Sequence, residues 1–413
     1  MTPLPIPIDA DRFWLRLMAM AEIGKTPGGG VRRLALTDED RAARDLLSEW
    51  FGAVGLRVRV DDLGNMYGRR DGADPDAPPV VIGSHLDTVP TGGRFDGALG
   101  VLGALEVVHA LNDTGIRTRA PLEVVNWSNE EGARFQPAML ASGVIVGALP
   151  LEAAYAARDS TGRTFGDELE RIGYRGGAGD RLAQCAAYVE LHVEQGPVLE
   201  RAGAQIGVVE GIEGISWNRV EVTGRAAHAG PTPMADRRDA LVAAARLVLL
   251  LRDAAQALER VRLTVGRLQV SPNTINVVPG AVEMSLDVRS PRGDGLDAAL
   301  RAADQACRQV ADLDGVTVRR AEFWRSPATP FAERVVEAVA SAASRRGYTT
   351  KRLWAGAGHD AKYVADRFPA GMIFVPSAGG LSHNEQEWTA PEDCVRGATV
   401  LLDTALALAG IVV

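Results

Sequence analysis

The sequence has few cysteines and no apolar run of the length that a membrane span needs. Cys185, Cys307 and Cys394 stand singly and far apart. This spacing fits neither a disulfide framework nor a CxxC metal site, so we interpret the cysteines as packing residues. The apolar stretch "LVAAARLVLLL" is interrupted by an arginine and is too short to cross a bilayer. We therefore expect no membrane partner.

The N-terminus and the charge exclude two further classes. "MTPLPIPIDADRFW" has no basic flank followed by an apolar core, so it does not resemble a secretory signal peptide. The net charge of −8 is spread along the chain and gives no sign of nucleic-acid binding. A hydrophobic content of 46% with 24% charged residues is typical of soluble globular proteins. We expect a cytoplasmic protein.

The length predicts two domains, because 413 residues exceed what one ordinary hydrophobic core accommodates. In the first half, helical and strand patterns alternate. Helices are predicted at 37–55, where Thr37 is a candidate N-cap, and at 97–115, and strands at 78–88, 120–128 and 188–196. This alternation predicts an α/β sheet with helices on its faces.

Near residue 212 the order of the patterns changes. Strand, helix, strand, strand, helix and strand follow at 215–224, 237–259, 261–270, 274–290, 295–315 and 316–324. This β-α-β-β-α-β order is that of the split ferredoxin-like unit. The earlier alternation then resumes with a helix at 331–347 and a strand at 370–380. We predict an α/β protein in which a large discontinuous domain, 1–211 and 328–413, carries an inserted small domain, 212–327.

Histidines and acids gather where the predicted strands end. His85 and Asp87 are two residues apart at one strand end, so their side chains share a face. A ligating imidazole needs a partner on its other nitrogen, and the Asp87 carboxylate is a candidate for it. Asp96 follows in a glycine-rich loop before a helix, where capping that helix is the alternative role. Alone, His-x-Asp is a weak signal.

Three other strand ends carry further residues of this kind. Glu130 and Glu131 follow one strand, His192 ends another, and His383 follows a third. In α/β sheets, ligands bind at the carboxyl ends of the strands. A two-metal site would then be built from His85, Asp96, Glu131, His192 and His383, with Asp96 bridging the ions. These ligands suit Zn²⁺, Mn²⁺, Co²⁺ and Ni²⁺ about equally.

The pair Glu130–Glu131 needs an explanation, because adjacent carboxylates beside a core repel each other. Both acids are tolerable if a divalent cation neutralises Glu131 while Glu130 acts as a general base. Glu130 would then take a proton from the metal-bound water and pass it to a leaving nitrogen. The alternative is a solvated acidic turn at the start of the next helix.

Taken together, the motifs resemble those of the hydantoinase/carbamoylase family of amidases. The similar segments are "GSHLDTVPTGGRFDGALGV", "NWSNEEGARF", "ELHVEQGP", "GRAAHAGPTPM" and "GAGHDA…GLSHNE", and the resemblance extends from about residue 10 to 408. This family includes N-carbamoyl-L-amino-acid hydrolases, β-ureidopropionases and allantoate amidohydrolases. It belongs to a superfamily of dinuclear metallopeptidases that also contains aminoacylases.

The resemblance implies roles for the metal ligands and for a histidine from a second subunit. One ion would be held by His85, Asp96 and His192, and the other by Asp96, Glu131 and His383. Glu130 would be the general base, and Asp87 would be a further catalytic residue. In this family the small domain forms a homodimer, so His228 would polarise the scissile carbonyl of the neighbouring site. This chain has Ala227 where relatives often have asparagine.

The resemblance also implies a grip on a carboxylate-bearing substrate. Asn276 and Arg289 match residues that hold the substrate carboxylate, and Gln195, Gly358 and His359 lie at substrate-contacting positions. A guanidinium suits a carboxylate, although the residue pattern alone favours a surface salt bridge for Arg289. The glycines around His359 allow close approach to a ligand, and a plain loop remains the alternative.

The expected reaction is hydrolysis of the ureido C–N bond of an N-carbamoyl-amino acid, which yields the amino acid, ammonia and carbon dioxide. Within the family, allantoate amidohydrolase is the first alternative. A dinuclear aminopeptidase or aminoacylase of the wider superfamily is the second. A metal-binding or dimerising relative without catalysis is the third, although the complete ligand set with its base disfavours it.

Overall fold

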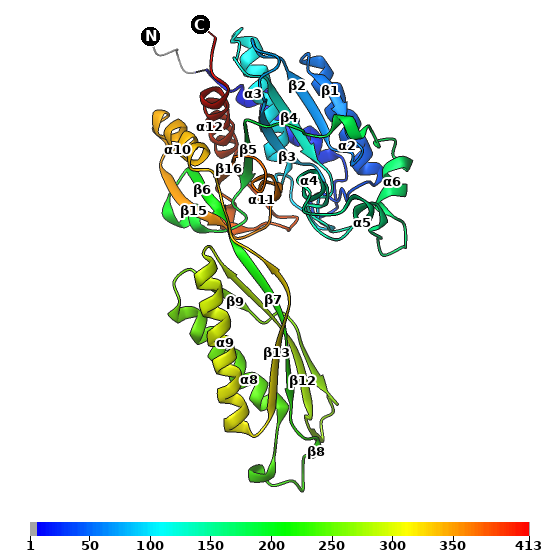
Figure 1. Cartoon of the computed structure of the whole chain (residues 1–413), viewed down its shortest axis with the longest axis vertical. Helices are drawn as coiled ribbons and strands as arrows, with labels where there is room; N and C mark the ends of the chain where they lie inside the picture. Colours follow the sequence, from blue (N-terminus) through cyan, green and yellow to red (C-terminus); the bar gives the residue numbers. More distant parts are fainter. Residues whose placement is uncertain (1–5, 413) are drawn as a thin grey trace. The chain divides into compact units, whose positions relative to one another are not determined.

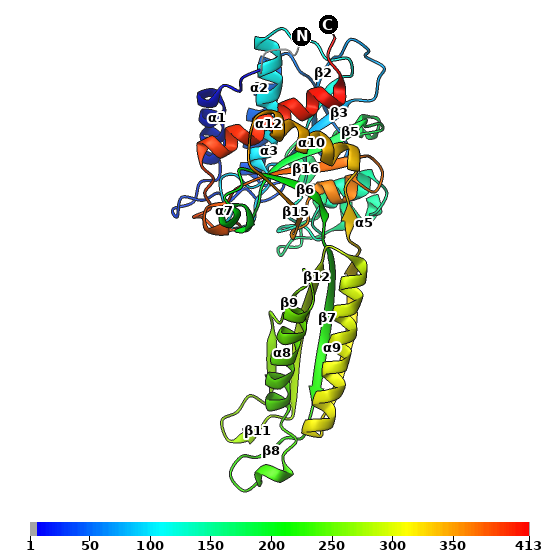
Figure 2. The ribbon, with the colours of Figure 1, turned by 90° about the vertical axis from the view of Figure 1, so that its left-hand side faces the viewer.

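The computed structural model describes residues 6–412, which form two compact units (Figure 1, Figure 2). The first unit runs to Gly211 and resumes at Pro330, and the second comprises Ile212–Thr329. Among residues 6–412, no helix is long and apolar enough to cross a membrane.

A mixed sheet of nine strands forms the centre of the first unit. Its order is β1-β2-β4-β3-β5-β16-β6-β14, and β15 also pairs with β6. The strands are β1 (Arg57–Val60), β2 (Met66–Arg70), β3 (Val80–His85), β4 (Leu122–Trp127), β5 (Ala187–Val193), β6 (Ile206–Ile212), β14 (Thr329–Pro330), β15 (Thr350–Ala355) and β16 (Ala370–Val375). The four central strands β4, β3, β5 and β16 run parallel. Every residue of these four strands is buried, as their apolar sequences require in a sheet covered on both faces.

Helices cover this sheet. They are α1 (Ala10–Glu22), α2 (Asp38–Ala53), α3 (Ala98–Asp113), α4 (Leu140–Ile145), α5 (Leu151–Ala156), α6 (Phe165–Arg171), α7 (Val198–Ala202), α10 (Glu333–Arg345), α11 (Asp360–Val364) and α12 (Pro391–Ala409). The predicted N-cap of α2 is confirmed, because the Thr37 side chain accepts a hydrogen bond from the Asp40 N–H. Helix α3 is buried along most of its length and packs against β3, β5 and α12.

The second unit has a separate sheet with its own core. In chain order it contains β7 (Gly214–Thr223), β8 (Ala227–His228), α8 (Ala240–Ala257), β9 (Arg262–Thr264), β10 (Leu268–Ser271), β11 (Val277–Val278), β12 (Ala281–Ser290), α9 (Gly293–Asp314) and β13 (Thr317–Ser326). The sheet order is β10-β12-β7-β13, with β9 also on β12, while β8 pairs with β11. Alternate residues of β7 and β12 are buried in one core with residues of α8 and α9.

One strand prediction in this unit was wrong in detail. The sequence 261–270 was expected to form a single strand, but the structure has β9 and β10 with residues 265–267 between them. Both pieces pair with β12. Similarly, the stretch predicted as one strand at 274–290 contains the short β11 and the long β12, separated by Pro279 and Gly280. Proline and glycine both weaken a strand interior, which accounts for this second break.

Candidate active site

Four neighbouring parallel strands bring the predicted site residues to one edge of the sheet. β3 ends at His85, β4 ends just before Ser128–Glu131, β5 carries His192 near its end, and β16 leads into the loop that contains His383. Because the strands are parallel, their carboxyl ends meet at the same edge. Sheet topology therefore brings together the strand ends from which these side chains and loops extend.

Asp96 lies at the centre of this group. Its Oδ1 is 3.1 Å from Nε2 of His192 and 3.6 Å from Nε2 of His85. Its Oδ2 is 3.5 Å from Nε2 of His383, which is itself 3.3 Å from Oε2 of Glu131. Each oxygen of Asp96 thus faces a different set of partners, as a bridging carboxylate requires.

Two sets of three side chains have the spacing of metal ligands, with all ligand atoms of a set within 4.8 Å of one another. The sets are His85, Asp96 and His192, and Asp96, Glu131 and His383. A third set joins Glu190, His192 and His359. Glu190 is a poor ligand, because it already accepts hydrogen bonds from Ser84 Oγ, Tyr188 OH and the Ala361 N–H.

Backbone contacts fix which imidazole nitrogen faces Asp96. Nδ1 of His85 lies 2.9 Å from the main-chain oxygen of Asp87, and Nδ1 of His192 lies 2.9 Å from that of Val193. A carbonyl oxygen only accepts, so each Nδ1 carries a hydrogen and donates it. The lone pair of each neutral imidazole is therefore on Nε2, directed toward Asp96. This is the tautomer that a metal ligand needs.

Asp87 has a different partner from the one we expected. Its carboxylate is not on Nδ1 of His85, where the main-chain oxygen of Asp87 sits. Instead, its two oxygens accept hydrogen bonds from the main-chain N–H groups of Glu130 and Glu131, at 3.2 and 3.3 Å. Asp87 thereby ties the loop after β3 to the two adjacent acids after β4.

The capping role considered for Asp96 is also not seen. The N-cap of α3 is Gly97, which has no side chain to cap with, and its φ is +65°. A Cβ on Gly97 would overlap with the His85 ring. Glycine is therefore required at position 97 by both the backbone and the space that His85 occupies, and the Asp96 side chain is directed to the histidines.

The buried charge around Asp96 favours a cation. Burial raises the pKa of Glu130 well above its ordinary value, and nearby Asp360 and Glu131 raise it further. Burial and Asp96 likewise raise the pKa of Glu131. Burial lowers the pKa of His192, but Asp96 and Glu190 outweigh it and bring the value to about 9. A divalent cation would neutralise these buried carboxylates and keep His192 in its neutral form, so the donor set is suited to metal binding.

Three predicted substrate-contacting residues lie beside this cluster or close to it. Gln195 donates from Nε2 to Oδ2 of Asp96 at 2.9 Å, while its buried Oε1 has no hydrogen-bond partner among residues 6–412. The ring centroid of the buried His359 is 4.4 Å from that of His192, and its Nε2 likewise has no partner in this described part of the chain. Gly358 leaves room for Met139, whose side chain a Cβ at that position would crowd.

His228, Asn276 and Arg289 belong to the second unit. His228 is exposed on β8 and pairs with Val277 of β11, so it lies near Asn276. Asn276 precedes the first residue of β12, whereas Arg289 lies near the last, where it forms an ion pair of 2.9 Å with Asp287. Between Ala281 and Arg289, β12 spans roughly 26 Å at the usual rise per residue. Asn276 and Arg289 of one copy are therefore too far apart to hold the same small carboxylate.

The sequence prediction missed several polar residues of the site, most of them buried. Glu387 accepts hydrogen bonds from the N–H groups of Phe95 and Asp96, and Ser382 Oγ lies 2.9 Å from Oδ2 of Asp96. Asp360 accepts from Ser142 Oγ, and Glu190 accepts three hydrogen bonds. The only signals in the sequence were the position of Glu190 two residues before His192, on the same strand face, and of Glu387 close after His383.

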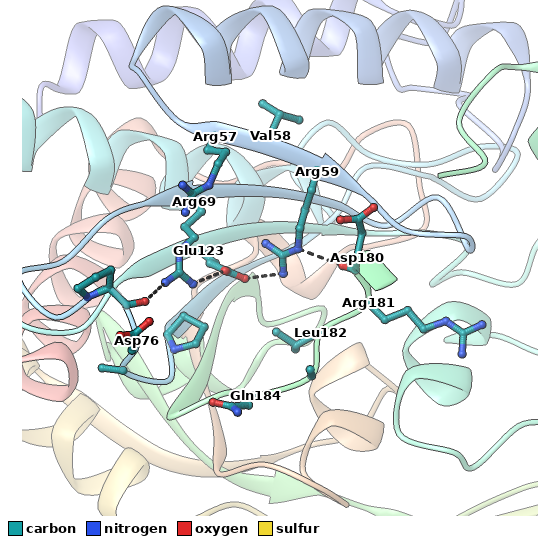
Figure 3. A pocket seen from close by; sticks show the side chains of 14 residues that line it. Arg57, Val58, Arg59, Arg69, Asp76, Glu123, Asp180, Arg181, Leu182 and Gln184 are labelled. Atoms are coloured by element: carbon teal, nitrogen blue, oxygen red, sulfur yellow. Dashed lines mark hydrogen bonds and ion pairs between the residues drawn. The ribbon is translucent and has the colours of Figure 1, made fainter. Parts of the chain in front are cut away.

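A separate hollow of about 650 Å³ lies over β1 and β2 (Figure 3). Four arginines line it, and each forms an ion pair within the protein: Arg59 and Arg69 with Glu123, Arg57 with Asp71, and Arg181 with Asp62. None of the candidate metal ligands lines this hollow. We therefore place no chemistry there.

Comparison with known proteins agrees with the motifs. The model of peptidase family M20/M25/M40 matches residues 81–407. An N-carbamoyl-L-amino-acid amidohydrolase of Rhizobium meliloti is 45% identical, over 98% of this chain and 98% of its own length. The allantoate amidohydrolase of Bacillus subtilis is 34% identical, over 94% of this chain and 95% of its own. The crystal structure of a hydantoinase/carbamoylase family amidase from Burkholderia ambifaria superimposes with a TM-score of 0.95 at 49% identity, covering 99% of this chain and 100% of that one.

These matches span nearly the whole chain and include every motif on which the predicted family rests. The chain belongs to peptidase family M20/M25/M40 and, within it, to the hydantoinase/carbamoylase family of amidases.

Proposed function

We propose that this protein is a metal-dependent amidohydrolase that cleaves the ureido C–N bond of N-carbamoyl-L-amino acids. The observation that carries the proposal is the convergence of three imidazole Nε2 atoms on the two oxygens of Asp96, with the Glu130 carboxylate beside them. The 45% identity to an N-carbamoyl-L-amino-acid amidohydrolase supports this substrate class over allantoate, whose named relative is 34% identical.

The ligands we propose are His85, Asp96 and His192 for one ion and Asp96, Glu131 and His383 for the other. Zn²⁺ and Mn²⁺ are our first choices, and Co²⁺ and Ni²⁺ suit the same donors. When bound, such ions act as Lewis acids and lower the pKa of a coordinated water toward ~7.

Glu130 is the proposed general base. Its Oε2 lies 3.6 Å from Nε2 of His85, and its main-chain N–H is held by Asp87. Burial and the surrounding acids raise the pKa of Glu130, which suits a group that must hold a proton between two steps. Glu130 takes the proton from the attacking water at Oε2 and delivers it to the leaving amino nitrogen. Carbamic acid then breaks down to ammonia and carbon dioxide.

The rest of the site would bind and orient the substrate. Gln195 and His359 each offer a buried polar atom without a partner within residues 6–412. We propose that Arg289 and Asn276 grip the carboxylate and that His228 polarises the carbonyl oxygen. Because Arg289 lies far along β12 from His228 and Asn276, these groups can serve one substrate only if two copies contribute. This separation supports a homodimer.

A panel of substrates tests the proposal. Metal-reconstituted protein is assayed for ammonia and amine release from N-carbamoyl-α-amino acids, N-carbamoyl-β-alanine, allantoate and N-acetyl-amino acids. We expect turnover of N-carbamoyl-L-amino acids in preference to the other three classes. Turnover of allantoate alone would move the protein to the allantoate branch, and turnover of acetyl substrates alone would overturn the ureido assignment.

A further inference from the structure

Glu387 is a buried acid in the loop between β16 and α12, and it contacts the segment that carries the proposed metal ligand Asp96. Its side chain is 2% exposed, and it is not among the candidate ligand sets. Its Oε1 accepts hydrogen bonds from two successive N–H groups, those of Phe95 at 3.0 Å and Asp96 at 3.1 Å. These two bonds fix the peptide unit that carries the Asp96 side chain.

The other oxygen of Glu387 reaches Asp96 by a second route. Oε2 of Glu387 lies 2.7 Å from Oγ of Ser382, and this Oγ lies 2.9 Å from Oδ2 of Asp96. The hydroxyl has one hydrogen, so it donates to only one of the two carboxylates at a time. Glu387 therefore holds the backbone of Asp96 directly, and its second oxygen lies one hydroxyl group away from the Asp96 carboxylate.

The approach of Glu387 depends on a glycine in the loop that it contacts. A Cβ on Gly93 would overlap with the carboxylate of Glu387. The φ of Gly93 is not in the left-handed region, so the backbone itself does not demand glycine there. The lack of a side chain at Gly93 thus leaves the space that the Glu387 carboxylate occupies.

The loop that carries Glu387 and Ser382 also carries His383. Ser382 and His383 are adjacent, and Nε2 of His383 lies 3.5 Å from Oδ2 of Asp96. His383 has a φ of +51° and its side chain is half exposed, and its Nε2 is also 3.3 Å from Oε2 of Glu131. Contacts through Glu387 and Ser382 therefore tie the loop that carries His383 to Asp96, and these two residues are ligands of the same proposed ion.

We propose that Glu387, acting with Ser382, is a positioning residue that orients Asp96 as the bridging ligand and brings His383 into register with it. The inference rests on the proposed metal site but not on the identity of the substrate. Partners of metal ligands typically contribute a factor of about 10 to 100 in metal affinity. The effect should be larger for the ion held by Asp96, Glu131 and His383 than for the other one.

Glu385 provides a matched control. It lies in the same loop, two residues before Glu387, but its carboxylate contacts Thr26 Oγ1 instead of the Asp96 segment. Removing Glu385 therefore perturbs the same loop without touching the bridging ligand. The Glu385→Ala variant therefore distinguishes a general loosening of the loop from the loss of the contacts to Asp96.

The test is a titration of metal-free protein with Co²⁺, followed by calorimetry and by the visible absorption of bound Co²⁺. We expect Glu387→Ala to weaken one equivalent by about 10- to 100-fold and to change the Co²⁺ spectrum. Glu387→Gln keeps an acceptor for the two N–H groups and should recover much of the affinity. Ser382→Ala should shift the affinity in the same direction as Glu387→Ala, and Glu385→Ala should match wild type.

Two variants keep the test decisive if Glu387→Ala does not fold. Gly93→Ala displaces the Glu387 carboxylate without removing it, and Ser382→Ala removes only the link to Oδ2. Wild-type affinity and spectrum in both of these, or in a folded Glu387→Ala, would overturn the inference. If wild-type protein bound no Co²⁺, the proposed metal site itself would be wrong, which is a distinguishable result.

Discussion

Nε2 of His192 lies 3.1 Å from Oδ1 of Asp96, although the two residues are nearly a hundred positions apart in the sequence. Asp96→Asn keeps the size of this side chain but removes the charge shared by both proposed ligand sets. We expect the variant to lose both ions, because each set retains only two protein ligands of full strength. Activity should fall at least ~100-fold, and elemental analysis of the purified variant checks the metal loss. Two ions per chain in Asp96→Asn would contradict the bridging role.

Glu130→Gln tests the base separately from the metal. Glutamine has nearly the same shape but cannot take up the proton at Oε2. We expect the variant to bind metal as wild type does and to lose turnover by about 10²- to 10⁴-fold, the usual contribution of a general base. Metal content and kcat are measured on the same preparation. Near-normal turnover with full metal would assign the proton transfer to another group.

Asp87→Ala tests how the adjacent acids are held. The substitution leaves the buried N–H of Glu130 and the partly buried N–H of Glu131 without their acceptor, which costs about 1–3 kcal/mol in unfolding free energy for the buried group and less for the other. We expect lower stability and a fall in kcat of the order of 10- to 100-fold. Asp87→Asn retains one acceptor oxygen and should lie between Asp87→Ala and wild type. If Asp87→Asn and Asp87→Ala both behaved as wild type, the N–H contacts would have no part in positioning the base.

Asp61 gives a pH prediction away from the metal ligands. Burial raises the pKa of Asp61 from 3.8 to about 6, against the hydrogen bonds from Asn65, Leu63 and Tyr67. A carboxyl group whose pKa is raised by folding stabilises the fold most below pH 3.8, and this contribution is lost as the pH rises to about 6. A rise of the pKa from 3.8 to about 6 corresponds to at most ~3 kcal/mol of unfolding free energy.

The comparison with Asp61→Asn isolates this contribution, because asparagine does not titrate. The stability of wild type relative to the variant should decrease between pH 4 and pH 7. Denaturant unfolding of both proteins at a series of pH values measures the difference. A difference that stayed constant or increased with pH would show that Asp61 is ionised throughout.

Much of the sheet and the family could be predicted because the signals are local. The strand runs before His85 and before Glu130 are mostly apolar, so their burial and their place in an α/β sheet followed from the pattern. The motifs around His85, Glu130, His192 and His383 identified the family, and the comparisons confirmed it. Parallel topology then brings strand ends together without any knowledge of side-chain contacts.

The contacts behind the ligands could not be predicted from the sequence. Glu387 reaches the Asp96 segment across almost three hundred residues, and no periodicity encodes that approach. The actual partners of the Asp87 carboxylate depend on the turn after β4, where Asn129 adopts a φ of +57°. The break between β9 and β10 has no proline, and its only sequence signal is a single glycine, Gly266. Such features follow from tertiary packing, which local propensity does not determine.

The most direct test is anomalous diffraction from crystals of the metal-reconstituted protein, with data collected on both sides of the absorption edge. We expect two peaks on either side of the Asp96 carboxylate, one next to His85 and His192 and one next to Glu131 and His383. A single peak, or peaks at a distance from Asp96, would contradict a pair of ions sharing that aspartate.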